Sequence, residues 1–500
     1  MYCPFVSSGK ASSKLELFKK NNIHIGIISY VDALLDKNME KEYVLASIMV
    51  KKLLILTITA ALALSCATKS AAFKEIDHAV KDGDFETAIE TMETKQEARR
   101  PIYPERNSIL FFLDRGILEF YAGNYERSSW FLQEAERQIA EAYTKSLTQG
   151  LMTYILNDNA REYPGEDFED IYLNVFNALN YYNRGDIEGA LVEIRKLSVS
   201  SGKLDMLARK YQYKDPTSGM SLEEIVARES SGRGEIPQGK PVEFSNSALA
   251  RYLGALFYLG DRNYDAARIE FEQLQRAFLT QRNIYPHPIP FAVEQARNVP
   301  QGMARLNVIG FAGLSPVKEE QRVVHYFPFF RNPALHITVF RLPQLVPRPS
   351  EIDRIEVIVE GEDAFYLELL EDMGIVMQET FNARYSNILI KTYIRTLIKY
   401  TAADIASSAV NEASGDDSGL VGFLTSLGAR VAVDASENAD IRMSRFLPNR
   451  AYIGGINLTP GTYNVTINFL SRSRVVSQVV HRDVIVGERG LNLIDATSLN

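Results

Sequence analysis

Apolar residues recur at helical spacing through the first half of the chain. Between residues 109 and 121, Phe112, Gly116 and Phe120 follow one another every four positions, which places them on one face of a helix. After a short polar stretch, a second apolar face begins at Trp130. Two apolar faces joined by a short turn are typical of a helical hairpin, whose helices bury these faces against each other.

A short phrase marks the turn of each expected hairpin. It consists of Gly, then Asp or Asn, then an aromatic residue or Ile, with a small residue three places later. Gly ends one helix in a left-handed conformation, and Asp or Asn caps the next helix. We expect the aromatic residue, Tyr125 in the second copy and Tyr264 in the fourth, to pack back across the turn. The copies begin at Gly83, Gly123, Gly185 and, more loosely, Gly260.

These phrases resemble the turn of the tetratricopeptide repeat. The resemblance implies hairpins that stack into a concave solenoid, which binds extended peptides or partner helices. The intervals between the copies all exceed the family period of about 34 residues, so we expect insertions, the largest at residues 203–243. We interpret residues 66–299 as a domain of such hairpins. The tyrosines near the turns are expected to pack in the core rather than to bind a ligand: Tyr181, Tyr182, Tyr258 and Tyr264.

After Pro300 the pattern changes to short β-branched and aromatic runs punctuated by Gly and Pro, which is typical of strands. The expected strands are residues 306–311, 322–327, 335–340 and 352–359, and later 451–458, 462–470, 475–481 and 483–486. The helices expected between them are residues 365–380, 386–406 and 420–433.

These elements predict an α+β protein. N-terminal tetratricopeptide-like α-helical hairpins are followed, over residues 300–500, by a C-terminal β-sandwich-like module. Helices are inserted into this module at about residues 364–433.

A different pattern precedes the hairpins. Lys51 and Lys52 follow Met49, and an apolar run of 12 residues, Leu53–Leu64, leads to Ser65 and Cys66. The run is shorter than the roughly 20 residues that a helix needs to cross a bilayer. A basic start, a short apolar run and small residues before a cysteine are typical of a signal peptide, which we place at residues 49–65. Residues 1–48 lie upstream of it and are expected to be a mis-assigned N-terminal extension.

The residues before Cys66 resemble a lipobox, although Ala63-Leu64-Ser65 replaces its usual Leu followed by two small residues. The resemblance implies that Cys66 is lipidated and becomes the first residue, so that acyl chains hold the protein to a membrane. No Asp follows Cys66, which by the same resemblance implies an outer-membrane lipoprotein that faces the periplasm.

Composition and charge narrow the classes of function. Hydrophobic residues make up 46% of the chain and charged residues 24%, as in folded globular proteins. The formal net charge is −8, and no long basic run is present, which argues against a nucleic-acid partner. The only cysteines are Cys3 and Cys66, so the region after Cys66 has no disulfide.

Candidate chemistry is sparse. The six histidines contain no i, i+4 pair, and we expect His325 and His336, in strand-like runs, to be structural. Residues 219–223 lack the closing glycine of a nucleophile elbow, and residues 230–234 lack the lysine of a phosphate-binding loop. We therefore expect no catalytic residue, no metal and no cofactor, and the chain is not expected to be an enzyme.

Several further phrases resemble a family of uncharacterised bacterial tetratricopeptide-repeat lipoproteins. They are Asn246–Phe257, Gly313–Glu320, Glu437–Arg442 and Leu458–Tyr463. The resemblance implies the fold and the envelope location above, without an established activity.

The function expected from these features is a membrane-anchored scaffold that binds envelope proteins. A subunit of a secretion or export complex and a cell-wall-acting enzyme are the alternatives. The apolar segment 420–433 is expected to be buried; contact with a membrane or another subunit is its other interpretation.

Overall fold

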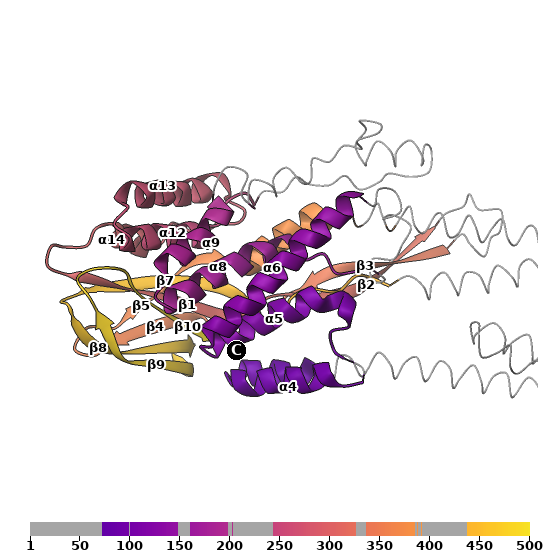
Figure 1. The fold of residues 1–500 in the computed structure, drawn as a ribbon, viewed down its shortest axis with the longest axis horizontal. Coiled ribbons are helices and arrows are strands. Elements are labelled where there is room, and N and C mark those ends of the chain that lie inside the picture. Colours follow the sequence, from indigo (N-terminus) through magenta and orange to yellow (C-terminus); the bar gives the residue numbers. More distant parts are fainter. Residues whose placement is uncertain are drawn as a thin grey trace, which may run out of the picture. The chain divides into compact units, whose positions relative to one another are not determined.

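A computed structural model of the chain describes residues 73–99, 101–148, 161–198, 203, 244–326, 337–385, 388, 392 and 438–500. The chain divides into two compact units, Met1–Phe73 and Lys74–Asn500, and the description below concerns the second. This unit contains both helices and sheets, as an α+β protein does (Figure 1).

The helices come in consecutive hairpins. A helical stretch at residues 73–81 precedes α4 (Phe85–Glu97). Three hairpins follow: α5 (Ser108–Tyr121) with α6 (Tyr125–Thr148), α8 (Asp167–Asn183) with α9 (Ile187–Ser198), and α12 (Ala248–Gly260) with α13 (Tyr264–Thr280). The short elements are η1 (Glu105–Asn107) and α14 (Phe291–Arg297). Neighbouring hairpins touch through α6 and α8 and through α9 and α12, so the hairpins stack in chain order.

The strands form two four-stranded sheets and one two-stranded sheet. The first sheet has the order β10-β1-β7-β6, with β1 (Ala304–Leu314), β6 (Glu368–Asp372), β7 (Pro448–Leu458) and β10 (Asn492–Ser498). The second has the order β5-β4-β8-β9, with β4 (Arg354–Val359), β5 (Phe365–Tyr366), β8 (Gly461–Ser471) and β9 (Arg474–Val486). β2 (Val317–Tyr326) pairs with β3 (Ile337–Val346), and β10 lies parallel to β1.

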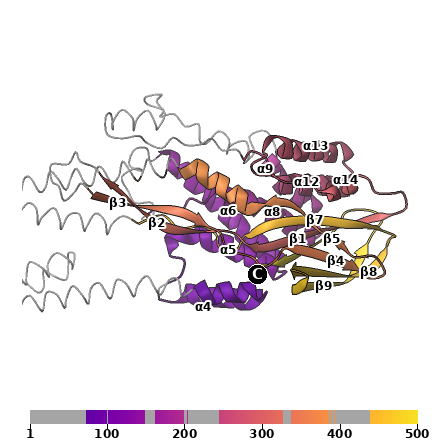
Figure 2. The same ribbon diagram turned by 180° about the vertical axis from the view of Figure 1, so that it is seen from behind.

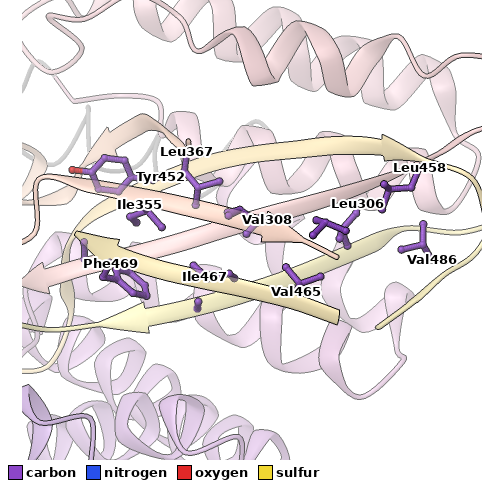
Figure 3. Packing of buried hydrophobic residues seen from close by; sticks show 14 of the residues in the cluster. Leu306, Val308, Ile355, Leu367, Tyr452, Leu458, Val465, Ile467, Phe469 and Val486 are labelled. Carbon is purple, nitrogen blue, oxygen red and sulfur yellow. The ribbon is translucent and has the colours of Figure 1, made fainter. Parts of the chain in front are cut away.

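One hydrophobic cluster joins the two four-stranded sheets. Leu306 and Val308 of β1 meet Ile355 of β4 and Ile467 and Phe469 of β8, and all five side chains are fully buried (Figure 3). Alternate residues of β4 point the other way and are more exposed, as the two-residue period of a strand requires. The two sheets therefore share one core.

Strand β1 is buried at every position because it has a neighbour on both faces. Leu306 and Val308 face the second sheet, whereas Ile309 and Phe311 lie outside that cluster and are also fully buried. The ring of Phe311 lies 5.2 Å from that of Phe176 in α8. Helices thus cover the face of the first sheet that the second sheet leaves open, as Figure 2 shows from behind.

The expected helix at residues 365–380 is wrong over its first half. β5 and β6 occupy residues 365–366 and 368–372, and a helix runs only from residue 373 to 385. Glu and Leu in this stretch suit a helix, but pairing of β6 with β7 buries Leu370 and Glu371 and decides the structure.

The expected strands 475–481 and 483–486 form the single strand β9, in which Asp483 has φ +53° and the pairing with β8 is irregular. Of the expected helix 386–406, only residues 388 and 392 are described, and residues 420–433 lie outside the described residues.

Two isoleucines of β4 test whether the shared core holds the sheets together. Ile355 is fully buried, whereas Ile358 is 39% exposed on the opposite face. We expect Ile355→Ala to lower the free energy of unfolding by about 2–5 kcal/mol, because it leaves a cavity in the core. Ile358→Ala is the matched control and should cost less than about 1 kcal/mol. Urea unfolding measures both, and equal losses would contradict this account of the core.

Candidate functional site

The first three repeated turns share one geometry. Gly83, Gly123 and Gly185 have φ values of +76°, +77° and +80°, in the left-handed region as expected. In each turn the glycine N–H donates to the carbonyl three residues earlier, and the next N–H donates to the carbonyl five residues earlier. This pair of bonds satisfies carbonyls that the end of a helix leaves free. The side chains of Asp84 and Asp186 then accept from backbone N–H groups of the next helix, as N-caps do.

The fourth turn has the same bonds but not the expected glycine. Gly260 is the last residue of α12, and the left-handed residue is Arg262, with φ +60°. The N–H groups of Arg262 and Asn263 donate to the carbonyls of Leu259 and Tyr258, so the motif is shifted by two residues. The glycine at position 260 instead allows a close approach of Leu491, because a Cβ atom on residue 260 would lie only 2.9 Å from the Cβ atom of Leu491.

The small residue after each turn lies between the paired helices. Ala88, Ser128, Ala190 and Ala267 occupy equivalent positions and are buried. The aromatic residues differ from one another. The ring of Tyr125 lies 5.8 Å from that of Phe120 across the turn, as expected.

Two aromatic expectations are wrong. Tyr264 is 67% exposed, so it does not pack in the core. Trp130, expected on an apolar face inside the hairpin, is 58% exposed on the outside of α6, where it contacts Phe112 and Phe131. Its helical position points away from Leu132 and Ala135, which are the residues buried in the hairpin.

The first helix of each hairpin faces the protein's own strands. In α8, the Tyr182 hydroxyl donates to the Leu491 carbonyl at 3.0 Å and accepts from the Leu493 N–H at 2.9 Å. In α5, the Tyr121 hydroxyl donates to the Phe446 carbonyl at 3.0 Å. The side of these two hairpins that carries Tyr121 and Tyr182 is therefore covered by residues of the same chain.

A buried carboxylate, Glu371, connects β6 to two hairpins. It accepts hydrogen bonds from the hydroxyls of Tyr172 at 2.8 Å and Tyr285 at 2.7 Å, from the Ser247 hydroxyl, and from the Leu249 N–H at the start of α12. Within the part of the chain that the structure describes, Glu371 forms no ion pair, and burial raises its pKa. In the sequence Glu371 is followed by Asp372 and comes three residues after Glu368, so it resembles one of several acidic residues on an exposed helix face.

A second cluster lies at the base of the β2–β3 pair. The carboxylate of Glu166, at the start of α8, binds both Lys318 of β2 and Arg384 of the helix at residues 373–385. Lys318 also donates to the carbonyl of Arg442 at 3.2 Å. Two phrases of the resemblance, Gly313–Glu320 and Glu437–Arg442, are thereby brought together.

Two fully buried carboxylates bind the same residue beside this cluster. Ser444 donates its N–H to Glu169 of α8 and its hydroxyl, at 2.6 Å, to Asp114 of α5. Tyr163 donates to Glu169, and Tyr103 donates to Asp114. Burial raises the pKa of both carboxyl groups, and with the neighbouring charge of Glu166 it raises that of Glu169 to about 8.

These clusters hold helices, strands and loops together through hydrogen bonds and ion pairs. Their carboxylates are buried and accept bonds from residues of other elements, so each one fixes a helix against a strand or loop. Among the residues described, no group of three or more His, Cys, Asp or Glu side chains could hold a metal ion. His325 lies in β2, whereas His336 and residues 219–223 and 230–234 are outside the described ranges.

Cys66, residues 1–48 and the expected signal peptide at 49–65 also lie outside the described residues. None of the helices in the described ranges combines the length and the apolar character that a membrane crossing requires.

Comparison with known proteins gives no relative. No family model, curated protein or solved structure matches the chain.

Opposite substitutions in two turns test the shared turn geometry. No atom lies within 4 Å of a Cβ placed at Gly123, so Gly123→Ala introduces only the left-handed backbone cost and should destabilise by about 1 kcal/mol. Arg262→Gly removes the same cost and should stabilise by up to about 1 kcal/mol. Thermal unfolding measures both changes, and a shift in the same direction for both variants would contradict the shared geometry.

The pH dependence of stability tests the buried Glu169. Its pKa is about 8 in the folded chain, against an ordinary value of 4.5, so between these pH values the folded chain holds a proton that the unfolded chain has released. Its contribution to stability is therefore present at low pH and is lost as the pH rises from about 4.5 to about 8. We expect the Tm of the wild type to fall relative to that of Glu169→Gln over this range. Glu126→Gln, at an exposed carboxylate, should keep the wild-type profile, and parallel profiles for wild type and Glu169→Gln would refute the raised pKa.

Proposed function

We propose that this chain is an outer-membrane lipoprotein that faces the periplasm and serves as a scaffold for an envelope protein. The observation that carries the anchoring is the sequence from Met49 to Cys66, with two lysines, a 12-residue apolar run and a cysteine after small residues. Acyl chains on Cys66 would hold the folded unit, Lys74–Asn500, at the membrane surface.

In this proposal the hairpins are tetratricopeptide-like, and the two four-stranded sheets form a β-sandwich-like module. The four turns with equivalent backbone bonds support the first assignment. The hydrophobic cluster shared by the two sheets supports the second. The mixed sheet, in which β10 is parallel to β1, distinguishes the module from sandwiches built of antiparallel strands alone.

The hydrogen bonds between hairpins and strands support a scaffold function. Glu371, Glu169 and Asp114 each bind residues of several elements and are buried, so the hairpins and the sheet form a rigid surface. A rigid surface suits partner binding because little conformational freedom is lost on association. The second candidate function is that of a subunit in a secretion or export complex. In that case residues 420–433 would contact the neighbouring subunit.

Lipid labelling tests the anchoring. Cells fed an alkyne analogue of palmitate should label the wild type, and Cys66→Ala should abolish the label and release the protein from the membrane fraction, because the acyl chains have no attachment point. Cys3→Ala is the matched control, since Cys3 precedes the expected signal peptide, and it should retain full labelling. Label that persists in Cys66→Ala, or an intact chain in the cytosol with residues 49–65 attached, would refute the proposal.

A further inference from the structure

The second helices of three hairpins expose an apolar residue at the same place. Trp130, Val192 and Ile269 are each the sixth residue of α6, α9 and α13, and their exposed fractions are 58%, 49% and 47%. These hairpins stack in chain order, and Lys196 of α9 binds Glu136 of α6 at 2.7 Å. Equivalent positions therefore recur along the outer side of the stack, and we call these three residues the apolar row.

An acidic residue lies one helical turn before each member of the apolar row. Glu126, Glu188 and Asp265 precede it by four positions, which puts each pair on one face of its helix. All three carboxylates are exposed, and within the described chain none of them forms an ion pair. We call these residues the acidic row.

The fold itself does not require both rows. An acidic residue in the first turn stabilises a helix through its dipole, which accounts for the acidic row. The turn and its acidic residue do not explain the apolar row. Helix α4 follows the same kind of turn, and its sixth residue, at the position equivalent to the apolar row, is Glu90. The turn itself therefore does not need an apolar residue at this position. Trp130 also packs on Phe112 of α5, but more than half of its side chain is exposed, and three hairpins in succession expose an apolar residue here.

The opposite side of the hairpins is already occupied. Tyr121, Tyr182 and Phe176 of the first helices contact the protein's own β-strands and the segment before β7. These contacts leave the outer side of the hairpins, where the two rows lie, for a partner.

We propose that the apolar and acidic rows bind a partner protein through an amphipathic helix whose apolar face is flanked by Lys and Arg. This inference rests on the proposed scaffold function and names the surface that the partner uses. Cationic side chains would pair with the acidic row while apolar ones cover the apolar row. The acidic row disfavours an anionic lipid surface, and pairing of two copies through this face would bring like charges together.

Trp130 is the only tryptophan of the chain, so its fluorescence reports on this surface directly. The probe is a synthetic amphipathic helix with Leu on one face and Lys beside it, and its control has Glu in place of Lys. With purified full-length protein, the Lys peptide should shift the Trp130 emission to the blue in a saturable manner. The double variant Glu126→Lys/Glu188→Lys should weaken its binding by at least about tenfold and should improve binding of the Glu peptide.

Glu362→Lys/Asp363→Lys is the matched control, because it changes the net charge equally at exposed positions of the β4–β5 connection. It should leave the affinity of the Lys peptide within about twofold of wild type. An equal loss in both double variants, or no binding to the wild type, would overturn the proposal. A blue shift of the Trp130 emission with phosphatidylglycerol vesicles alone would instead identify a lipid surface as the occupant. A blue shift that grows with protein concentration in the absence of peptide would identify a second copy of the chain. Either result would overturn the proposal. Because this measurement does not involve Cys66, its failure is distinct from a failure of lipid labelling.

Discussion

A carboxylate that water cannot reach must have its oxygens hydrogen-bonded by the protein, because leaving them without partners costs more than the bonds themselves contribute. Glu371 meets this condition only when α8, the start of α12 and the segment after α13 all surround β6. Glu169 and Asp114 meet it only when the segment around Ser444 lies against α5 and α8. Separating the helices from the strands would break several of these hydrogen bonds at once. These bonds therefore make the hairpins and the sheets one cooperative body rather than two domains in loose contact.

This constraint changes what helical hairpins can do. Stacked hairpins can offer one side to a peptide, but here aromatic side chains of the first helices, such as Phe176, pack against β1. Recognition of other molecules is left to the outer helices, where Trp130, Val192 and Ile269 are exposed at equivalent positions.

Features governed by local chemistry could be predicted from the sequence. Gly83, Gly123 and Gly185 end helices because glycine tolerates positive φ, and most strands were found from β-branched runs bounded by Gly and Pro. Features decided by tertiary contacts could not. A loose copy of the phrase put the fourth cap at Gly260 rather than Arg262. Helical propensity hid the strand around Glu371, and no local pattern shows that a carboxylate will be surrounded by hydroxyls from three distant segments. The expected lipidation of Cys66 lies outside the described residues and stays a prediction.

The parallel pairing of β10 with β1 has a consequence for biogenesis. β1 begins the strand-rich part, and β10 is the last strand described, so their contact spans nearly all of that part. The core cluster includes Ala496 of β10, and the sheet that faces the helices cannot close until this strand has been synthesised. Pairings between such distant segments form slowly because the loop entropy must be lost first. For a protein that is exported as proposed, delayed closure keeps the chain extended while it threads through a translocation pore, and folding is completed only on the far side.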